Sequence, residues 1–147
     1  MMKHTILILF LFLSLLCHGQ SYKFFTTDRE LSSSLINKIY QDRNGMIWIA
    51  TEDGLNRYDG AKFITYKHDP ENEYSLCHNY VRVLYEDSKG RLFVGTYNGI
   101  QLYDPETDSF SARAQWEDGK TFDSNIMSIL ERRNGEIWVS GNNLCTI

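Results

Sequence analysis

Hydrophobic and turn-forming positions recur along the chain with a period of 45 residues. This step links one glycine, one aromatic and four aliphatic positions: Gly45, Gly90 and Gly135; Trp48, Phe93 and Trp138; Ile36, Val81 and Ile126; Ile39, Leu84 and Ile129; Ile47, Leu92 and Ile137; Ile49, Val94 and Val139. So many positions in one register indicate a repeated structural unit rather than chance.

Each unit divides into short β-prone runs separated by turns. The turns at 42–45 and 87–90 end in glycine, which adopts the positive φ that other residues resist. The runs that follow are rich in β-branched and aromatic residues, which favour strands. We predict strands at 35–41, 46–50, 55–58 and 62–66; at 79–86, 91–95, 100–103 and 109–113; and at 125–131 and 136–139. Arg43 and Lys89, within the turns, are expected to be ordinary surface residues.

The first run of each unit is open to two interpretations. Ile36 and Ile39 are three residues apart, a spacing that suits a helix face as well as a strand. A run of about eight residues bounded by turns is short for a helix, so we favour a strand. Four strands in 45 residues match the size of a propeller blade. The sequence therefore predicts an all-β fold: a partial β-propeller of four-stranded antiparallel blades in an incomplete ring.

The predicted organisation has five parts. Residues 1–19 are a signal peptide, 20–34 an N-terminal strand and connector, 35–78 blade 1, 79–123 blade 2, and 124–147 an incomplete blade 3. The strand at 22–26 resembles the fourth run at 62–66, and we expect it to complete the last blade of a full ring. Such closure leaves no sheet edge open.

The N-terminus has the features of a secretory signal. Lys3 precedes an apolar run at 6–16, which is shorter than the roughly 20 residues that span a bilayer. We expect cleavage after Gly19 and export to the periplasm. The alternative is a lipoprotein anchored at Cys17, but Leu16 stands where lipoprotein signals favour a small residue.

Charge and cysteine content exclude some functions. The chain holds 15 basic and 19 acidic residues, and cleavage would leave 14 and 19, a net charge of −5. Without a basic stripe, nucleic-acid binding is disfavoured. Cys77 and Cys145 fall in different units, so we expect no disulfide between them.

Two segments closely resemble the two-component regulator propeller repeat. The stretch 44–59 carries the pattern, and 89–104 repeats it with Phe93 in place of tryptophan. With the leader and Glu30–Ser34, the chain resembles the N-terminal periplasmic region of Bacteroides-type hybrid two-component sensors. That resemblance implies detection of polysaccharide breakdown products, further blades, a membrane anchor, and a histidine kinase that this chain does not carry. It also implies a homodimer in the full-length form.

Aromatic residues allow two interpretations. Trp48 and Trp138 could stack on sugars, but residues that repeat with the fold more often pack between blades. Trp116 has no counterpart in unit one and lies in the connector 114–122, where it is a candidate for stacking or for ordinary loop packing.

Metal and catalytic interpretations have weak support. Residues 104–108 space three carboxylates alternately, but they lack the glycine and distal glutamate of a calcium loop, so we predict a turn. His68 and His78 lack a metal-ligand spacing and are expected to be solvated loop residues. Carboxylates at 52, 53, 71 and 73 could supply a glycosidase pair, but any acidic chain offers such a choice. We predict no cofactor, no metal and no enzymatic activity.

A ligand, if bound, should lie on one face of the predicted propeller. With strands alternating up and down, the second-to-third turns share a face with the connectors 67–77 and 114–122. Long loops on a rigid scaffold commonly carry binding. Our candidate ligand-binding residues are Glu52, Tyr97, Asn98 and Trp116.

Two functions from different classes remain. The first is a sensor segment that binds an oligosaccharide and signals to a kinase. The alternative is a propeller scaffold for protein association, without direct ligand binding. The sequence does not separate them, because aromatic residues that stack on sugars and aromatic residues at protein interfaces look alike in a sequence.

Overall fold

The computed structural model describes residues 22–28, 30–112, 114 and 123–147, which form strands, turns and irregular segments. The predicted signal peptide at 1–19 and Trp116 lie outside these residues. In the described part of the chain, no helix has the length and hydrophobicity to cross a membrane. Cys77 and Cys145 are not joined by a disulfide.

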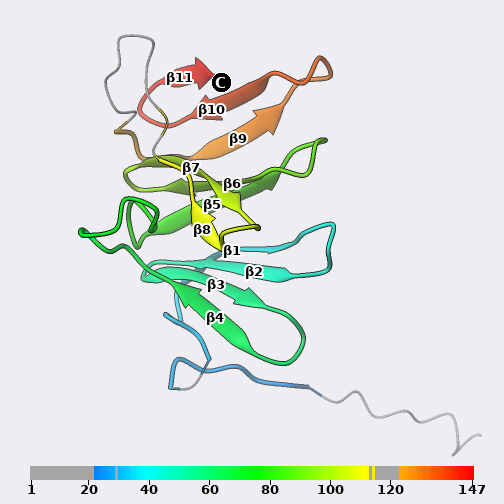
Figure 1. Cartoon of the computed structure of the whole chain (residues 1–147), viewed down its shortest axis with the longest axis vertical. Coiled ribbons are helices and arrows are strands. Elements are labelled where there is room, and N and C mark those ends of the chain that lie inside the picture. The colour runs from blue at the N-terminus through cyan, green and yellow to red at the C-terminus, as the bar shows by residue number, and fades with distance from the viewer. Residues whose placement is uncertain (1–21, 29, 113, 115–122) are drawn as a thin grey trace, which may run out of the picture.

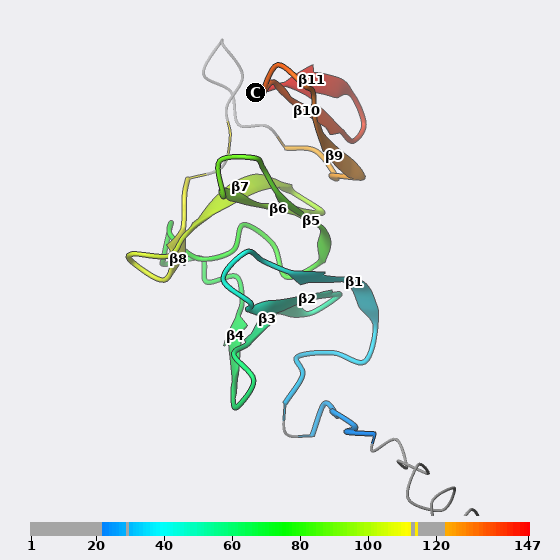
Figure 2. The same cartoon turned by 90° about the vertical axis from the view of Figure 1, so that its right-hand side faces the viewer.

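Three antiparallel sheets follow one another along the molecule (Figures 1 and 2). The first contains β1 (Ile36–Gln41), β2 (Ile47–Thr51), β3 (Gly54–Tyr58) and β4 (Phe63–Tyr66). The second contains β5 (Val81–Glu86), β6 (Leu92–Thr96), β7 (Gly99–Asp104) and β8 (Ser109–Phe110). The third contains β9 (Ser128–Glu131), β10 (Ile137–Ser140) and β11 (Leu144–Thr146).

The sheets are arranged as blades. β1 lies beside β5, and β5 beside β9, so the first strands of successive sheets are neighbours, as inner strands are around a propeller axis. The ring is not closed in this structure, and the predicted all-β partial propeller is confirmed. The first runs are strands rather than helices. Below, the sheets are called blades 1, 2 and 3.

The first turn of every blade has one geometry. Gly45, Gly90 and Gly135 have φ of 84°, 84° and 85°, the left-handed region that favours glycine. In blade 1 the amide of Gly45 donates to Asp42 O over 2.9 Å, and Asp42 Oδ1 accepts from Asn44 N and Met46 N. Asp87 makes the same side-chain bonds in blade 2, which explains why an aspartate and a glycine recur at this spacing in blades 1 and 2; blade 3 has Arg132 in place of the aspartate and keeps the glycine.

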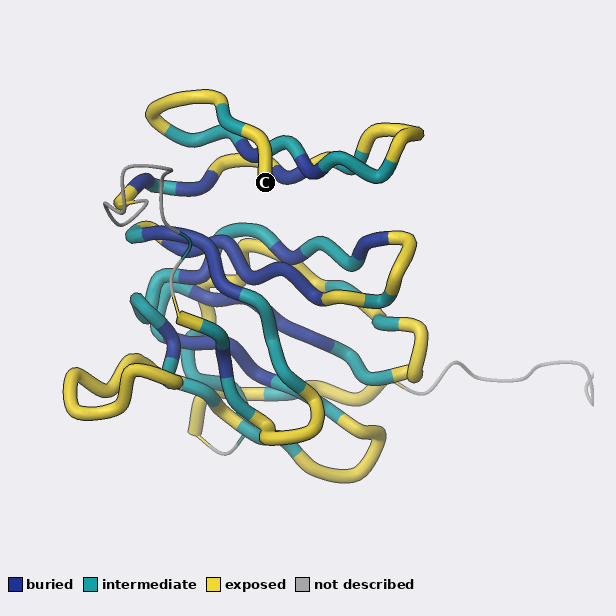
Figure 3. Tube along the Cα trace, turned by 45° about the horizontal axis from the view of Figure 1, so that its top comes forward, coloured by how far each residue is buried: buried dark blue, intermediate teal, exposed yellow. Residues whose placement is uncertain are grey.

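Two apolar clusters fill the spaces between blades. The first, between blades 1 and 2, includes Trp48, Leu55, Val81 and Leu84. The second, between blades 2 and 3, consists of Phe93, Ile100, Ile126, Ile129, Ile137 and Val139. Figure 3 shows that the buried residues lie mainly within the sheets, whereas the residues at the loop tips are exposed. Trp48 is 1% exposed, which confirms its packing role.

A polar contact also joins the blades, and it corrects one expectation. Arg43 is not an ordinary surface residue: its Nε lies 2.6 Å from Glu86 Oε1 of blade 2, whose side chain is almost buried. Tyr40 Oη donates to Glu86 Oε2 over 3.0 Å. The same relation recurs one repeat later, because Ser88 N and Oγ both donate to Glu131 of blade 3.

Three predicted strands differ from the structure by three residues or more, and one of them, β9, begins at Ser128 rather than at 125. The fourth strand of blade 2 ends at Phe110 rather than 113. Ser111 N still donates to Leu102 O, but Leu102 N donates to Ser111 Oγ over 2.9 Å and Ser111 O accepts from Gln101 Nε2 over 2.8 Å, so side-chain bonds replace the next step of the backbone ladder.

Residues 22–26 form no strand. Phe25 instead packs against the rings of Tyr58 and Phe63, at 5.3 and 5.0 Å. A strand needs a partner strand for its backbone groups, and none of the described strands pairs with residues 22–26.

Candidate functional site

The turns between second and third strands share a face with the connector 67–77. Lys67 Nζ lies 2.6 Å from Asp53 Oδ2, and Asn79 Nδ2 donates to Asp53 Oδ1 over 3.2 Å. His68 N in turn donates to Asn79 Oδ1 over 2.7 Å. The predicted common face is therefore confirmed for this connector, whereas most of the connector 114–122 lies outside the described residues.

Buried threonines shape these turns. Thr51 Oγ1 donates to Gly54 O over 2.8 Å and accepts from Asp53 N over 3.1 Å. Thr96 repeats both bonds with Gly99 and Asn98, each at 3.1 Å. Because each hydroxyl is fully buried, it fixes the direction in which the turn projects its side chains.

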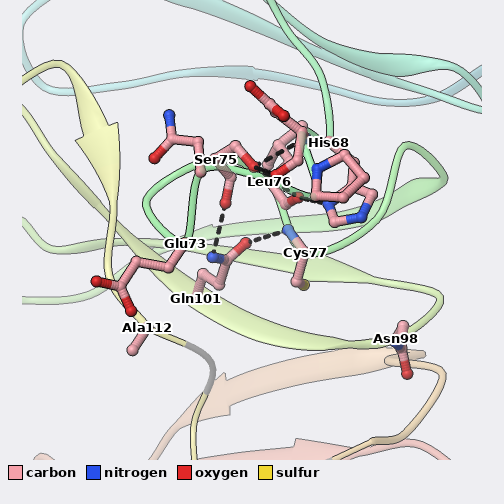
Figure 4. A pocket seen from close by; sticks show the side chains of 11 residues that line it. His68, Glu73, Ser75, Leu76, Cys77, Asn98, Gln101 and Ala112 are labelled. Atoms are coloured by element: carbon pink, nitrogen blue, oxygen red, sulfur yellow. Dashed lines mark hydrogen bonds between the residues drawn. The ribbon is translucent and has the colours of Figure 1, made fainter.

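A cavity of about 410 Å³ lies between the connector and blade 2 (Figure 4). It is lined by His68, Asp69, Pro70, Asn72, Glu73, Ser75, Leu76, Cys77, Asn98, Gln101 and Ala112. Its volume is in the range of small-molecule sites, roughly 300–1,000 Å³. The predicted residue Asn98 is part of this cavity.

Gln101 attaches the connector to blade 2. Its side chain is buried; Nε2 donates to Ser75 O over 3.0 Å and to Ser111 O over 2.8 Å, and Oε1 accepts from Cys77 N over 2.7 Å. One repeat earlier, Asn56 Oδ1 accepts from Ser32 N over 3.1 Å. A buried amide therefore holds the incoming segment in both blades, so one wall of the cavity is rigid.

The two histidines of the connector are not simply solvated. His68 Nδ1 lies 2.6 Å from Leu76 O, which only accepts, so this nitrogen carries the proton. His78 is half-buried, and its Nδ1 accepts from Tyr80 N over 2.9 Å. Burial, with the nearby charge of His68, lowers the pKa of the His78 ring. The expectation of a solvated loop histidine is thus wrong for His78, because the Tyr80 amide fixes its ring.

An exposed aromatic surface adjoins the cavity. The Tyr97 side chain precedes Asn98, is 56% exposed, and lies 5.6 Å from the His78 ring and 6.2 Å from the Tyr80 ring. Tyr80 Oη donates to Glu52 Oε1 over 3.0 Å, which raises the pKa of the tyrosine. Tyr80 thus links Glu52 and Tyr97, two of the predicted residues.

The candidate site also contains residues that the sequence analysis did not select. Tyr80, Gln101 and Glu73 belong to it, and Trp116 lies outside the described residues. The one available sequence signal was the 45-residue step from Asn56 to Gln101, which pairs two amides at a position where strands normally carry apolar residues. Nothing in the sequence marked Glu73 above its acidic neighbours.

Other polar clusters have structural partners. In the segment 104–108, Asp104 ends β7 and 105–108 form the predicted turn, in which Asp104 Oδ1 accepts from Glu106 N over 3.0 Å. Within the described residues, no group of three metal-ligating side chains comes together. A second cavity of about 430 Å³ lies beside Asp42, Trp48 and Arg57. There Asp42 Oδ2 accepts from Trp48 Nε1 over 2.8 Å, and Arg57 pairs with Asp108 at 2.8 Å.

Comparison with known proteins shows which family the repeated segments are similar to. The family model described as "Two component regulator propeller" matches residues 30–53 and 75–98, two segments that are themselves 45 residues apart. Histidine kinase P4 of Formosa agariphila is 40% identical over 73 residues. That match covers 47% of this chain and 5% of the kinase. Two segments of the chain therefore match the two-component regulator propeller model, and the chain matches a small part of that longer kinase.

Solved structures share the fold. The extracellular domain of a hybrid two component system from B. thetaiotaomicron superimposes with a TM-score of 0.70 and 22% identity, covering 88% of this chain and 19% of that one. Virginiamycin B lyase from Staphylococcus aureus superimposes with a TM-score of 0.55 and 17% sequence identity. That match covers 83% of this chain and 38% of the lyase. Since the extracellular domain of a two component system and a lyase share this architecture, function must be argued from the site.

Proposed function

We propose that the chain is part of the extracytoplasmic sensor of a hybrid two-component system, and that it detects a product of glycan breakdown. The regulator propeller repeats, the kinase relative and the extracellular neighbours support the sensor role. The kinase that receives the signal, further blades and a homodimeric receptor are the partners this proposal requires.

The ligand part of the proposal rests on the cavity and on the exposed aromatic ring beside it. Asn98 and Glu73 offer hydrogen-bonding groups at the cavity, and Tyr97 offers an exposed ring next to it. Sugar recognition needs both: polar groups for hydroxyls and an apolar ring face for the C–H side of a pyranose. Glu52, joined to Tyr97 through Tyr80, belongs to the same surface.

Calorimetric titration with a library of oligosaccharides tests this function. Saturable heat with at least one oligosaccharide is expected for the full chain. Weaker heat with Tyr97→Ala, but not with the exposed Tyr74→Ala, would connect binding to this surface. A library without any saturable response would contradict glycan sensing.

Export is part of the proposal, because a sensor of external glycans must reach them. Mass spectrometry of the exported protein should give an N-terminus within a few residues of Gln20. A product that retains Met1 would contradict export through the predicted leader, and a lipid on Cys17 would favour the anchored alternative.

A scaffold for protein association is the second candidate. It is favoured by apolar side chains on the outer surfaces of the two end blades, including Ile36, Ile39, Leu130 and Leu144. Sedimentation of the full-length receptor tests it: a concentration-dependent mass together with a silent oligosaccharide titration would favour this candidate over the first.

A further inference from the structure

A second cavity, the interblade cavity, lies at the other end of the blades from the connector. Because neighbouring strands run antiparallel, successive turns of a blade lie at alternate ends. The interblade cavity has a volume of about 430 Å³ and is lined by Asp42, Asn44, Met46, Trp48, Arg57, Asp59, Lys62, Ile64, Tyr103 and Pro105. Tyr103 and Pro105 belong to blade 2 and the others to blade 1, so an occupant would contact both blades.

Contacts within the protein hold the base of the interblade cavity in place. Trp48 Nε1 donates to Asp42 Oδ2 over 2.8 Å, and Oδ1 of the same carboxylate accepts from amides of the first turn. The Arg57 guanidinium lies 5.6 Å from the centre of the Trp48 ring and 5.8 Å from that of the Tyr103 ring. Because these side chains are already positioned, a ligand does not have to order them on binding.

The rim of the interblade cavity offers polar groups that remain available. Asn44, Asp59 and Lys62 are exposed. Asp59 Oδ1 accepts from Ala61 N and Lys62 N, each over 2.8 Å, which leaves Oδ2 for another donor. Within the part of the chain that the structure describes, no hydrogen bond or ion pair engages Lys62 Nζ or the Asn44 side-chain amide. The rim therefore presents an ammonium group, a carboxylate oxygen and an amide to a ligand.

Lys62 and Asp59 place opposite charges at one rim. The Lys62 and Ala61 amides, together with the Lys62 charge, hold the pKa of the Asp59 carboxyl below its usual value, so this group stays ionised at neutral pH. A hydroxyl can accept a hydrogen bond from an ammonium group and donate one to a carboxylate. A ligand with neighbouring hydroxyls can therefore serve both charges, whereas an anion would be repelled by Asp59 and a cation by Lys62.

The apolar part of the lining suits the carbon side of a sugar ring. Met46, Ile64 and Pro105 line the same cavity as the polar rim. A pyranose has hydroxyls at its edge and C–H groups on its faces, so it needs polar and apolar contacts side by side. The volume also lies in the range of small-molecule sites, roughly 300–1,000 Å³.

We propose that the interblade cavity is a second sugar site, in which Lys62 and Asp59 bind hydroxyls of an uncharged saccharide and Asn44 adds a further hydrogen bond. The inference rests on the proposed glycan-sensing function, because it assigns the same class of ligand to another position. The described lining residues of the two cavities are all different, so the two sites can be removed separately.

Calorimetric titration of the full chain counts the sites. The probes are gluco-, galacto- and manno-configured trisaccharides, which carry no charge. At least one of them should bind at two sites per chain. Tyr97→Ala should remove the site at the connector, and Lys62→Met should weaken the other by about tenfold. Lys89→Met makes the same change at an exposed lysine outside both cavities and should alter neither site.

A second variant tests the role of the carboxylate. Asp59→Asn keeps an Oδ1 acceptor for the two turn amides and replaces Oδ2 by a donor, so it should also weaken the interblade site by about tenfold. Lys62→Met and Asp59→Asn change the net charge in opposite directions, so a shared loss excludes an effect of net charge. Full affinity in Asp59→Asn would overturn the paired-charge site. If Lys62→Met unfolds, Asp59→Asn decides.

The pattern of lost sites separates this inference from the proposed function. A single site that Tyr97→Ala abolishes and Lys62→Met leaves unchanged would overturn the inference and leave glycan sensing at the connector intact. A single site with the reverse response would support the interblade cavity and contradict the ligand site at the connector. No saturable heat with any of these trisaccharides would overturn the inference, and the wider oligosaccharide library would then decide glycan sensing.

Discussion

Ile39 and Leu84 occupy the same position in successive blades, yet Ile39 is 59% exposed and Leu84 is 3% exposed. Leu84 is covered by blade 1, whereas no described residue of the chain forms a blade on the outer side of Ile39. The apolar positions of each blade thus fit packing against another blade on both faces. The stability effect of each position depends on whether that neighbour is present.

Truncating these two residues should therefore have different consequences. Leu84→Ala should lower the free energy of unfolding by about 2–5 kcal/mol, the usual cost of a buried leucine. Ile39→Ala should change it by less than about 0.5 kcal/mol, as at other surface positions. Urea denaturation of the two variants measures the difference. Equal losses would mean that Ile39 is covered in solution.

The glycine turns should resist β-branched substitution. Gly45→Val and Gly90→Val place a β-branched residue at φ 84°, with an expected loss of about 1–3 kcal/mol. Gly90→Val should be the more damaging, because a Cβ there would lie 2.5 Å from Nη1 of Arg43, which pairs with Glu86. Lys89→Val, an exposed neighbour, is the control in chemical denaturation. A control loss as large as the glycine losses would refute the turn geometry.

A carboxylate between blades 1 and 2 should make stability depend on pH. Asp108 Oδ1 accepts from Tyr66 Oη at 2.6 Å and Tyr103 Oη at 2.7 Å. Partial burial raises the pKa of Asp108, but these bonds and the Arg57 charge outweigh it and lower the pKa below its usual value. Burial and Asp108 together raise the pKa of Tyr103 to about 12.

A folded-state pKa below the unfolded one means that Asp108 stabilises the protein above about pH 4, and that this contribution is lost as pH falls through the folded-state value. Asn tolerates the positive φ of 53° at this position. Asp108→Asn should therefore lower the free energy of unfolding at pH 7, and should make the fall of that free energy between pH 5 and 2 less steep. Glu106→Gln, at an exposed position in the same turn, is the control. A decline as steep in Asp108→Asn as in the parent would contradict the assignment.

Self-association should follow from the uncovered blade faces. If one face presents on the order of 500 Å² of apolar surface, leaving that surface in water loses about 12 kcal/mol of hydrophobic stabilisation at ~25 cal/mol/Å². That is comparable to the whole stability of a typical domain, about 5–15 kcal/mol. The chain alone should therefore be marginally stable and show a mass that rises with concentration in sedimentation velocity. Ile39→Glu should reduce the association more than Lys38→Glu on the opposite side of β1. A cooperatively melting monomer would contradict the open-ring account.

The repeat made most of the fold predictable from sequence. A 45-residue step defines the blades, because only a repeated unit keeps glycine, aromatic and aliphatic positions in register, and the turn glycines require a positive φ wherever they recur. The early end of β8 was not predictable, because it depends on the Gln101 side chain reaching Ser111 O and on the Ser111 hydroxyl reaching Leu102 N, contacts that no sequence pattern marks. The role of Arg43 was hidden for the same reason: its partner Glu86 is 43 residues away.

The candidate site was predictable in part. Strand alternation placed Asn98 and the connector on one face, and the structure brings them together at the cavity. Composition gave no reason to select Glu73 over Glu71, since only the fold of the connector decides which carboxylate borders the cavity. The link from Glu52 to Tyr97 passes through Tyr80, whose position depends on how the two blades pack.

Hydrogen–deuterium exchange of the full chain, with and without an oligosaccharide that binds, tests ligand sensing at this cavity most directly. The account predicts slower exchange at 68–77, 97–101 and 111–112, where the connector and blade 2 enclose the cavity, with little change at the turn 132–135 of blade 3. Slower exchange confined to strands between blades, with none at the connector, would contradict it.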